Sequence, residues 1–467
     1  MRFAKQSAFY VGLIVFFGGL IFYLLHIGPN HINPDQVRHI KPEIKNAIPE
    51  PGFFNGIIIS NFKEALPRLL LQIIVIIAAT QFLGSIFKRF GQPPVIGETV
   101  AGIILGPSLF GLLFPSSFEF IFPAESLANL RFLSQIGLIL FMFIVGMELD
   151  SRLVRKQAFE AVIISHASIL IPYTLGVSVS FFLYDKYATG QTDFYSFALF
   201  MGIAMSITAF PVLARIIRDR KLTDTKLGIL AISCAASDDV SAWCILAILI
   251  AYVNSGSGLN GLIVVGMVLL YVLVMLIPVR IFLTKIQSYH ETGAIGYNVL
   301  MSVVFILLLC SAYCTEVIGI HALFGAFLAG IIIPKNSFLE KQIVSRISDL
   351  TMVMFLPLFF VYTGLRTNAG ILTTGGLWFS FLLILFIAVA GKFAGSALVA
   401  RVLGQTWKDS LSIGALMNTR GLMELIVLNI GYDMGILSTE IFSMMVLMAL
   451  LTTMMTSPLL NWIGKKG

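Results

Sequence analysis

Two adjacent aspartates, Asp238 and Asp239, lie in the middle of an apolar stretch that is long enough to cross a membrane. A charge at that depth costs about 2.5–3.5 kcal/mol on insertion scales, so such residues are rare and are functional by default. Two neighbouring carboxylates cannot both ionise cheaply, so at least one is expected to hold a proton or a small cation. Because the two ions compete for the same oxygens, the pair suits a coupled exchange of a cation for protons. The alternative is a buried ion-pair network that only fixes helix packing.

Three further charged side chains lie at a similar depth in other apolar stretches. Lys392 is a candidate partner for Asp238, because a buried ammonium needs a counter-charge to stay protonated. The alternative for Lys392 is that it snorkels to the membrane surface. Arg420 and Glu424 are four residues apart, which places them one turn apart on a helix and makes an ion pair between them possible.

Two apolar stretches contain helix breakers at mid-depth. Thr208 is followed by Pro211 in the first, and Asn418 and Gly421 flank Arg420 in the second. Broken helices free backbone carbonyls and expose helix-dipole ends near the bilayer centre, where ions can bind. Arg420 is expected to balance these exposed ends. For Pro211 taken alone, an ordinary helix kink is the alternative.

An alkali-cation site is expected beside the first break. A hard cation takes several oxygen ligands. The carboxylates of Asp239 and Asp238, the hydroxyl of Thr208, freed backbone carbonyls and water would supply them. No cofactor is expected.

The composition of the whole chain is that of a polytopic membrane protein. Of its 467 residues, 58% are hydrophobic and 12% are charged, whereas soluble domains carry roughly 25% charged residues. An ordinary soluble enzyme is therefore excluded. The net charge of +7 is small for this length, and the basic residues of the chain form short clusters between apolar runs. Both observations argue against a nucleic-acid partner. The four cysteines lie within apolar runs without a CxxC spacing, so they are predicted to pack rather than to bind metal.

Hydropathy predicts fourteen membrane-spanning helices in an all-α fold. They are placed near 8–26, 67–87, 94–113, 131–149, 157–184, 194–217, 227–253, 260–284, 295–314, 317–334, 347–365, 371–400, 409–431 and 438–463. Lys and Arg are concentrated in the loops of one side, which predicts that both termini are cytoplasmic.

Three regions follow from this assignment. Residues 1–26 are predicted to form a retained anchor helix, with a cleaved signal peptide as the alternative. Residues 27–66 are predicted to form an extracytoplasmic loop, and residues 67–463 the transmembrane domain.

The two breaks take matching places in the chain. Without the anchor helix, thirteen segments remain, and 260–284 links a first set of six to a second set of six. Each break then falls in the fifth helix of its set, and the odd linker inverts one set relative to the other. Matching interruptions in inverted halves indicate a transporter site at the midplane.

The remaining polar residues give weaker signals. Glu148 could line an access funnel or pair with Arg152, and both possibilities stay open. His166 and His321 are predicted to be hydrogen-bonded structural residues rather than proton relays.

Several stretches together resemble the monovalent cation:proton antiporter-2 family, which includes bacterial sodium/proton and potassium/proton exchangers and plant cation/proton exchangers. The stretches are 141–150 (FMFIVGMELD), 208–215 (TAFPVLAR), 237–240 (SDDV), 418–426 (NTRGLMELI) and 452–459 (TTMMTSPL). They spread over nearly the whole transmembrane domain.

The resemblance implies a thirteen-helix core of two inverted six-helix repeats, in which two broken helices cross within a mobile ion-binding domain beside a dimerisation domain. Asp239 matches the essential carrier, Asp238 matches a position that is Asp in many charge-moving exchangers, and Lys392 matches the lysine before the second broken helix. The implied protein is a homodimer in a bacterial inner membrane, not an enzyme.

The implied activity is electrogenic exchange of Na⁺, in preference to K⁺, for protons by an elevator-type alternation of access. The alternatives are a K⁺/H⁺ antiporter or a cation channel on the same fold. An intramembrane aspartyl protease is a remote alternative, because that chemistry needs aspartates on opposite sides of a peptide, whereas Asp238 and Asp239 are adjacent.

Overall fold

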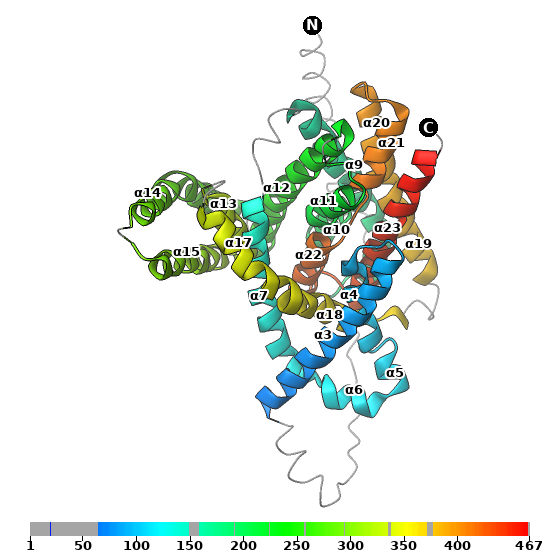
Figure 1. Ribbon diagram of the computed structural model, residues 1–467. Coiled ribbons are helices and arrows are strands. Elements are labelled where there is room, and N and C mark those ends of the chain that lie inside the picture. The colour runs from blue at the N-terminus through cyan, green and yellow to red at the C-terminus, as the bar shows by residue number, and fades with distance from the viewer. Residues whose placement is uncertain are drawn as a thin grey trace, which may run out of the picture.

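The computed structural model describes Gly19 and residues 64–148, 158–190, 192–223, 225–255, 258–293, 295–334, 338–370 and 377–465. The expected anchor helix, most of the expected outer loop and both termini lie outside these residues, apart from Gly19. Within the described residues the regular elements are helical, as the sequence predicts (Figure 1).

The helices follow one another as α3 (Ala65–Arg89), α4 (Pro94–Leu105), α5 (Phe110–Leu113), α6 (Pro115–Ile121), α7 (Leu127–Glu148), α9 (Ala158–Tyr187), α10 (Phe194–Ser206), α11 (Phe210–Asp219), α12 (Lys226–Ser255), α13 (Gly258–Val274), α14 (Arg280–Glu291), α15 (Tyr297–Ile318), α16 (Ala322–Ile331), α17 (Phe338–Leu350), α18 (Leu356–Leu365), α19 (Leu377–Val389), α20 (Gly395–Val402), α21 (Trp407–Met417), α22 (Leu422–Asp433) and α23 (Thr439–Lys465). Short π-helical turns at Met275–Val279, Thr351–Phe355 and Ala390–Ala394 join α13 to α14, α17 to α18 and α19 to α20.

In the described part of the chain, eleven helical segments are long and apolar enough to cross a membrane, and the bent pair α21–α22 raises the number to twelve. The stretch expected as a span at 317–334 differs from the prediction. Gly319 ends α15 in a left-handed conformation (φ 91°), so α16 begins only at Ala322 and contains ten residues. The thirteen-helix core and its inverted repeats therefore stay predictions.

Most of the helices fall into two groups whose most extensive pairings lie within the group, while one buried apolar core runs through both. The first group, which contains both breaks, comprises α9, α10–α11, α12, α19–α20, α21–α22 and α23. The second comprises α3, α4, α7, α15, α16 and α18. Helices α13, α14 and α15 project to one side in Figure 1, and they expose many large apolar side chains, as a surface in lipid requires.

The second group contains a close approach between α7 and α16. Gly146 of α7 faces Gly330 of α16, and a Cβ added to either would lie 2.2 Å from a backbone carbonyl oxygen of the other helix. Small residues at such crossings let helix backbones meet, which is how helices commonly associate in membranes.

Candidate ion-binding site

The two breaks lie in the first helix group. Residues 207–209 separate α10 from α11, and residues 418–421 separate α21 from α22, which are bent by 40° relative to each other. Pro211 lies in the first turn of α11, where a missing N–H leaves no hydrogen bond unmade. Pro211 therefore begins a second helix after the break rather than bending a continuous one.

The two breaks cross in direct contact. The hydroxyl of Thr208 donates to the carbonyl of Met417 over 3.1 Å, and the backbone N–H of Ala209 donates to the carbonyl of Thr419 over 3.0 Å. At the start of α22, a Cβ on Gly421 would lie 3.1 Å from Cγ2 of Val212, so glycine allows this close crossing.

Arg420 binds the end of the first broken helix. Its fully buried guanidinium donates to the carbonyls of Ala204 (3.1 Å) and Met205 (2.6 Å), in the last turn of α10. These carbonyls have no helical N–H partner, because the helix stops at the break. Arg420 also forms an ion pair with Glu424 at 3.1 Å. The guanidinium of Arg420, in the second break, thus caps the C-terminal end of α10 at the first break.

Asp238 is saturated with donors. One carboxylate oxygen accepts from the hydroxyl of Ser168 over 2.8 Å. The other accepts from the backbone N–H of Thr208 over 2.9 Å and from the ammonium of Lys392 over 3.1 Å. Both charged side chains of this pair are fully buried, so Lys392 does not snorkel to the surface.

Asp239 is in the opposite situation. It is 1% exposed, and no described residue places a donor in good hydrogen-bonding geometry with either carboxylate oxygen, although the backbone N–H of Phe210, the first residue of α11, lies near enough to interact with it. The side-chain amide of Asn418, within the second break, is also buried, and neither its oxygen nor its nitrogen has a hydrogen-bond partner among the described residues. Buried polar groups are normally paired, because leaving them unpaired is costly. Of the two aspartates, Asp239 is therefore the one with unpaired oxygens. The amide of Asn418 is unpaired as well, and both carboxylate oxygens of Glu424 lack a hydrogen-bond partner beyond its ion pair with Arg420.

The donor set consists of oxygens. Within the described residues there is no group of three or more His, Cys, Asp or Glu side chains that could hold a metal ion. A transition metal with nitrogen or sulfur ligands therefore does not fit, whereas hard cations take carboxylate, amide and carbonyl oxygens. Thr208, expected as a ligand through its hydroxyl, uses its proton on Met417 and keeps its oxygen lone pairs.

Two contributors to this site were not singled out by the sequence analysis: Ser168 and the side-chain amide of Asn418. A single serine in an apolar helix gives no chemical signal of its own, and Asn418 was identified only as a helix breaker. The signal that could have found Ser168 is Pro172, which lies four residues later in α9.

The structure describes the side chains of two of the three weaker candidates. Nδ1 of His166 is hydrogen-bonded to the carbonyl of Val162 at 2.8 Å, in agreement with its expected structural role. Nδ1 of His321 accepts from the backbone N–H of Leu323 over 3.4 Å at the start of α16. The side chain of Glu148 is not among the described ones.

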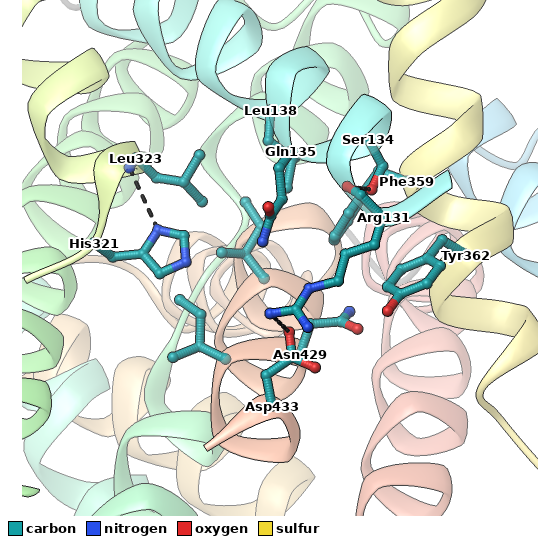
Figure 2. A pocket seen from close by; sticks show the side chains of 12 residues that line it. Arg131, Ser134, Gln135, Leu138, His321, Leu323, Phe359, Tyr362, Asn429 and Asp433 are labelled. Atoms are coloured by element: carbon teal, nitrogen blue, oxygen red, sulfur yellow. Dashed lines mark hydrogen bonds and ion pairs between the residues drawn. The ribbon is translucent and has the colours of Figure 1, made fainter. Parts of the chain in front are cut away.

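His321 lines a pocket between α7, α16, α18 and α22 (Figure 2). Arg131 forms an ion pair with Asp433 at 3.2 Å across this pocket, and Asp433 also pairs with Arg366 at the end of α18. Arg366 donates to the side-chain oxygen of Asn429 over 2.9 Å. We call Arg131, Arg366, Asn429 and Asp433 the bridging cluster, because it joins α22 of the first helix group to α7 and α18 of the second.

A helical membrane protein in which two interrupted helices cross beside a buried carboxylate has the architecture of a secondary transporter. Residues 73–464 match the family described as "Sodium/hydrogen exchanger, transmembrane", and the chain belongs to this family. It is thus a transporter and not an enzyme.

Relatives cover most of the chain. The chain is 43% identical over 393 residues to the Na(+)/H(+) antiporter NhaS4 of Synechocystis, covering 84% of this chain and 96% of that protein. It is 40% identical to cation/H(+) antiporter 17 of Arabidopsis thaliana, covering 89% of this chain and 50% of that protein. It is 31% identical to K(+)/H(+) antiporter 1 of Saccharomyces cerevisiae, covering 85% and 46%. The chain thus spans about half the length of the plant and yeast relatives.

The fold is also similar to a solved structure. The sodium proton antiporter MjNhaP1 from Methanocaldococcus jannaschii superposes with a TM-score of 0.60 at 16% identity, covering 85% of this chain and 98% of that chain. This likeness shows that the chain has the antiporter fold.

Proposed function

We propose that the chain exchanges Na⁺, in preference to K⁺, for protons, with Asp239 as the group that carries them in turn. The observation that supports this most directly is the buried carboxylate of Asp239, which has no hydrogen-bond partner among the described residues and lies next to the saturated Asp238. The relatives named as Na(+)/H(+) and cation/H(+) antiporters support the exchange. The yeast relative named as a K(+)/H(+) antiporter makes K⁺ the alternative cation.

The mechanism uses the contrast between the two aspartates. Asp239 loses its proton to the solution on one side and binds the cation, with Asn418, Thr208 and water completing the oxygen ligands. Neutralising the carboxylate lets the site move through an apolar environment, because a bare charge there is costly. On the other side, protons displace the cation. Arg420 and Glu424 keep the ends of the broken helices compensated throughout.

We propose that access alternates by an elevator-type movement of the helix group that contains the breaks relative to the second group. This proposal is supported by the pairing of the helices, which is most extensive within each group. By the family resemblance we further propose that exchange is electrogenic. We also propose a homodimer in a bacterial inner membrane, with both termini in the cytoplasm.

The test is proton/cation exchange in proteoliposomes. The protein is reconstituted with a fluorescent pH indicator, and Na⁺ and K⁺ are added in turn at several pH values. We expect Asp239→Asn to reduce exchange to the level of protein-free vesicles while the variant keeps the elution profile and melting temperature of a folded protein. The matched control is Asp409→Asn, which removes a half-buried carboxylate that accepts from the hydroxyl of Thr406 at the start of α21. Retained exchange in Asp239→Asn would refute the assignment, and cation flux without proton counterflow would identify a channel.

A further inference from the structure

The ammonium of Lys392 has three acceptors besides the carboxylate of Asp238. Its ammonium lies 3.1 Å from a carboxylate oxygen of Asp238, 3.0 Å from the carbonyl oxygen of Ser168 and 3.3 Å from the hydroxyl of Ser168. It also donates to the carbonyl of Ser206, the last residue of α10. Two of these acceptors are backbone carbonyls, and a backbone carbonyl inside a helix is normally occupied.

The carbonyl of Ser206 is available because α10 ends at the break, whereas that of Ser168 lies well inside α9. In a regular helix the carbonyl of Ser168 would accept from the N–H of the residue four positions later. That residue is Pro172, which has no N–H to donate. The proline therefore leaves one carbonyl of α9 unpaired, and this carbonyl faces the lysine.

The segment that carries Lys392 is shaped to reach this carbonyl. Lys392 lies in the π-helical turn Ala390–Ala394, and such turns are frequent at functional sites. Its neighbour Gly391 packs directly on the proline of α9, since a Cβ on Gly391 would lie 3.0 Å from Cα of Pro172. The contact between Gly391 and Pro172 thus holds Lys392 next to the carbonyl of Ser168, which lacks its helical N–H donor.

We propose that Pro172 and Ser168 are positioning residues for transport: the proline frees the carbonyl of Ser168, and this carbonyl and the hydroxyl hold Lys392 against Asp238. With Lys392 fixed on Asp238, Asp239 is left for the transported ion. Because two of its acceptors are uncharged carbonyls, the position of Lys392 does not depend on its ion pair with Asp238 alone. This inference rests on the exchange activity proposed above.

The decisive variant is Pro172→Ala, because it restores the N–H that the helix lacks and adds no bulk. We expect the melting temperature to stay the same or rise, since alanine favours a helix interior. We expect the maximal exchange rate to fall by about tenfold, the effect of losing roughly one hydrogen bond to a charged group. The KM for the cation should stay within about twofold, because Asp239 is not touched.

The matched control is Pro278→Ala, which restores an N–H to another helix-interior proline, on the exposed segment between α13 and α14. For the hydroxyl, Ser168→Ala is compared with Ser180→Ala, a buried serine of the same helix that bonds only within α9. We expect slower exchange in Ser168→Ala and wild-type exchange in both controls. Wild-type exchange in Pro172→Ala, or a loss of rate that goes with an equal loss of thermal stability, would overturn the proposal.

A double-mutant cycle provides a readout that does not depend on transport. If the freed carbonyl binds Lys392, Pro172→Ala should raise the melting temperature more in a Lys392→Met background than in the wild type, because no lysine contact is then lost. Equal increments in the two backgrounds would contradict the proposal. To separate this inference from the proposed function, the wild type and Asp239→Asn are each assayed in vesicles of the same composition as those used for Pro172→Ala. An inactive wild type would refute the proposed function, whereas a fully active Pro172→Ala beside an inactive Asp239→Asn would refute only this inference.

Discussion

At the scale of single residues, Asp238 and Asp239 are chemically different although they are adjacent. Successive residues of a helix point about 100° apart, so the two side chains face different neighbours. Asp238 faces Ser168, Lys392 and the backbone of the first break and accepts three hydrogen bonds. Asp239 accepts none from the described residues. The pair thus divides into Asp238, which is fixed by its hydrogen bonds, and Asp239, whose carboxylate oxygens have no hydrogen-bond partner among the described residues.

His321 is the residue for which the fold predicts a pH effect on stability. It lies in the turn between α15 and α16, with a φ of 77°, and its Nδ1 accepts from the N–H of Leu323. Burial lowers the pKa of His321 below its usual value of 6.5, against the opposing effect of Glu316 and Asp433; the charge of Arg131 adds to the lowering. A lowered pKa means that folding favours the neutral ring, so this contribution to stability is complete above about pH 6.5 and is lost as the pH falls through the lowered pKa.

We therefore expect His321→Asn to flatten the pH dependence of stability. Asparagine caps helices well, and it has no charge to gain in acid. Melting temperatures measured at pH 5 and pH 8 should differ less in the variant than in the wild type. An identical difference in the two proteins would show that His321 does not titrate in this range.

At the scale of elements, glycines and breaks determine how close the helices come. Helices α7 and α16 meet at Gly146 and Gly330, where each backbone occupies the space that a Cβ of the other would need. This contact anchors α16, whose ten residues are too few to cross a membrane alone.

We expect Gly330→Ala to destabilise the protein by about 2 kcal/mol or more, because the methyl group would push α7 away from α16. The matched control is Gly266→Ala in α13, where nothing lies within 4 Å of an added Cβ. That control should be neutral or slightly stabilising. The two variants are compared by thermal unfolding in detergent, and equal stability of both would contradict the packing argument.

The sequence predicted the parts of the site that depend on local signals. The charges in apolar runs and the breakers Pro211 and Gly421 stand out, because each violates a rule for membrane helices. The span expected at 317–334 was wrong in extent, since hydropathy does not register a left-handed turn at Gly319. The freed carbonyl of Ser168 was not predicted, because its partner comes from a residue 224 positions away.

The ion pairs of the bridging cluster could not be predicted from the sequence, for a different reason. Arg131, Arg366 and Asp433 lie near the ends of spans, where charged side chains are normally solvated. Their pairing depends on how α7, α18 and α22 are placed around the pocket in Figure 2.

At the scale of the whole molecule, the distribution of Lys and Arg predicts the orientation in the membrane. A cysteine scan tests it in a variant whose four native cysteines are replaced by serine. We expect Glu125→Cys, in the exposed turn before α7, to react with a membrane-impermeant maleimide in intact cells. Arg89→Cys, at the exposed end of α3, should react only after the cells are permeabilised. The reverse pattern would invert the proposed topology.

The bridging cluster connects the two helix groups through partly exposed charges: the side chain of Arg131 is 43% exposed and that of Asp433 is 19% exposed. Any sliding of α22 past α7 and α18 must break these ion pairs and lift Arg366, at the end of α18, from the ring of Tyr432 on α22. Dissolved ions weaken such pairs, since the screening length in 0.1 M salt is about 10 Å. The salinity of the medium on this side of the membrane would thus change the rate of turnover by weakening these ion pairs. This effect is separate from that of the cation that the protein transports.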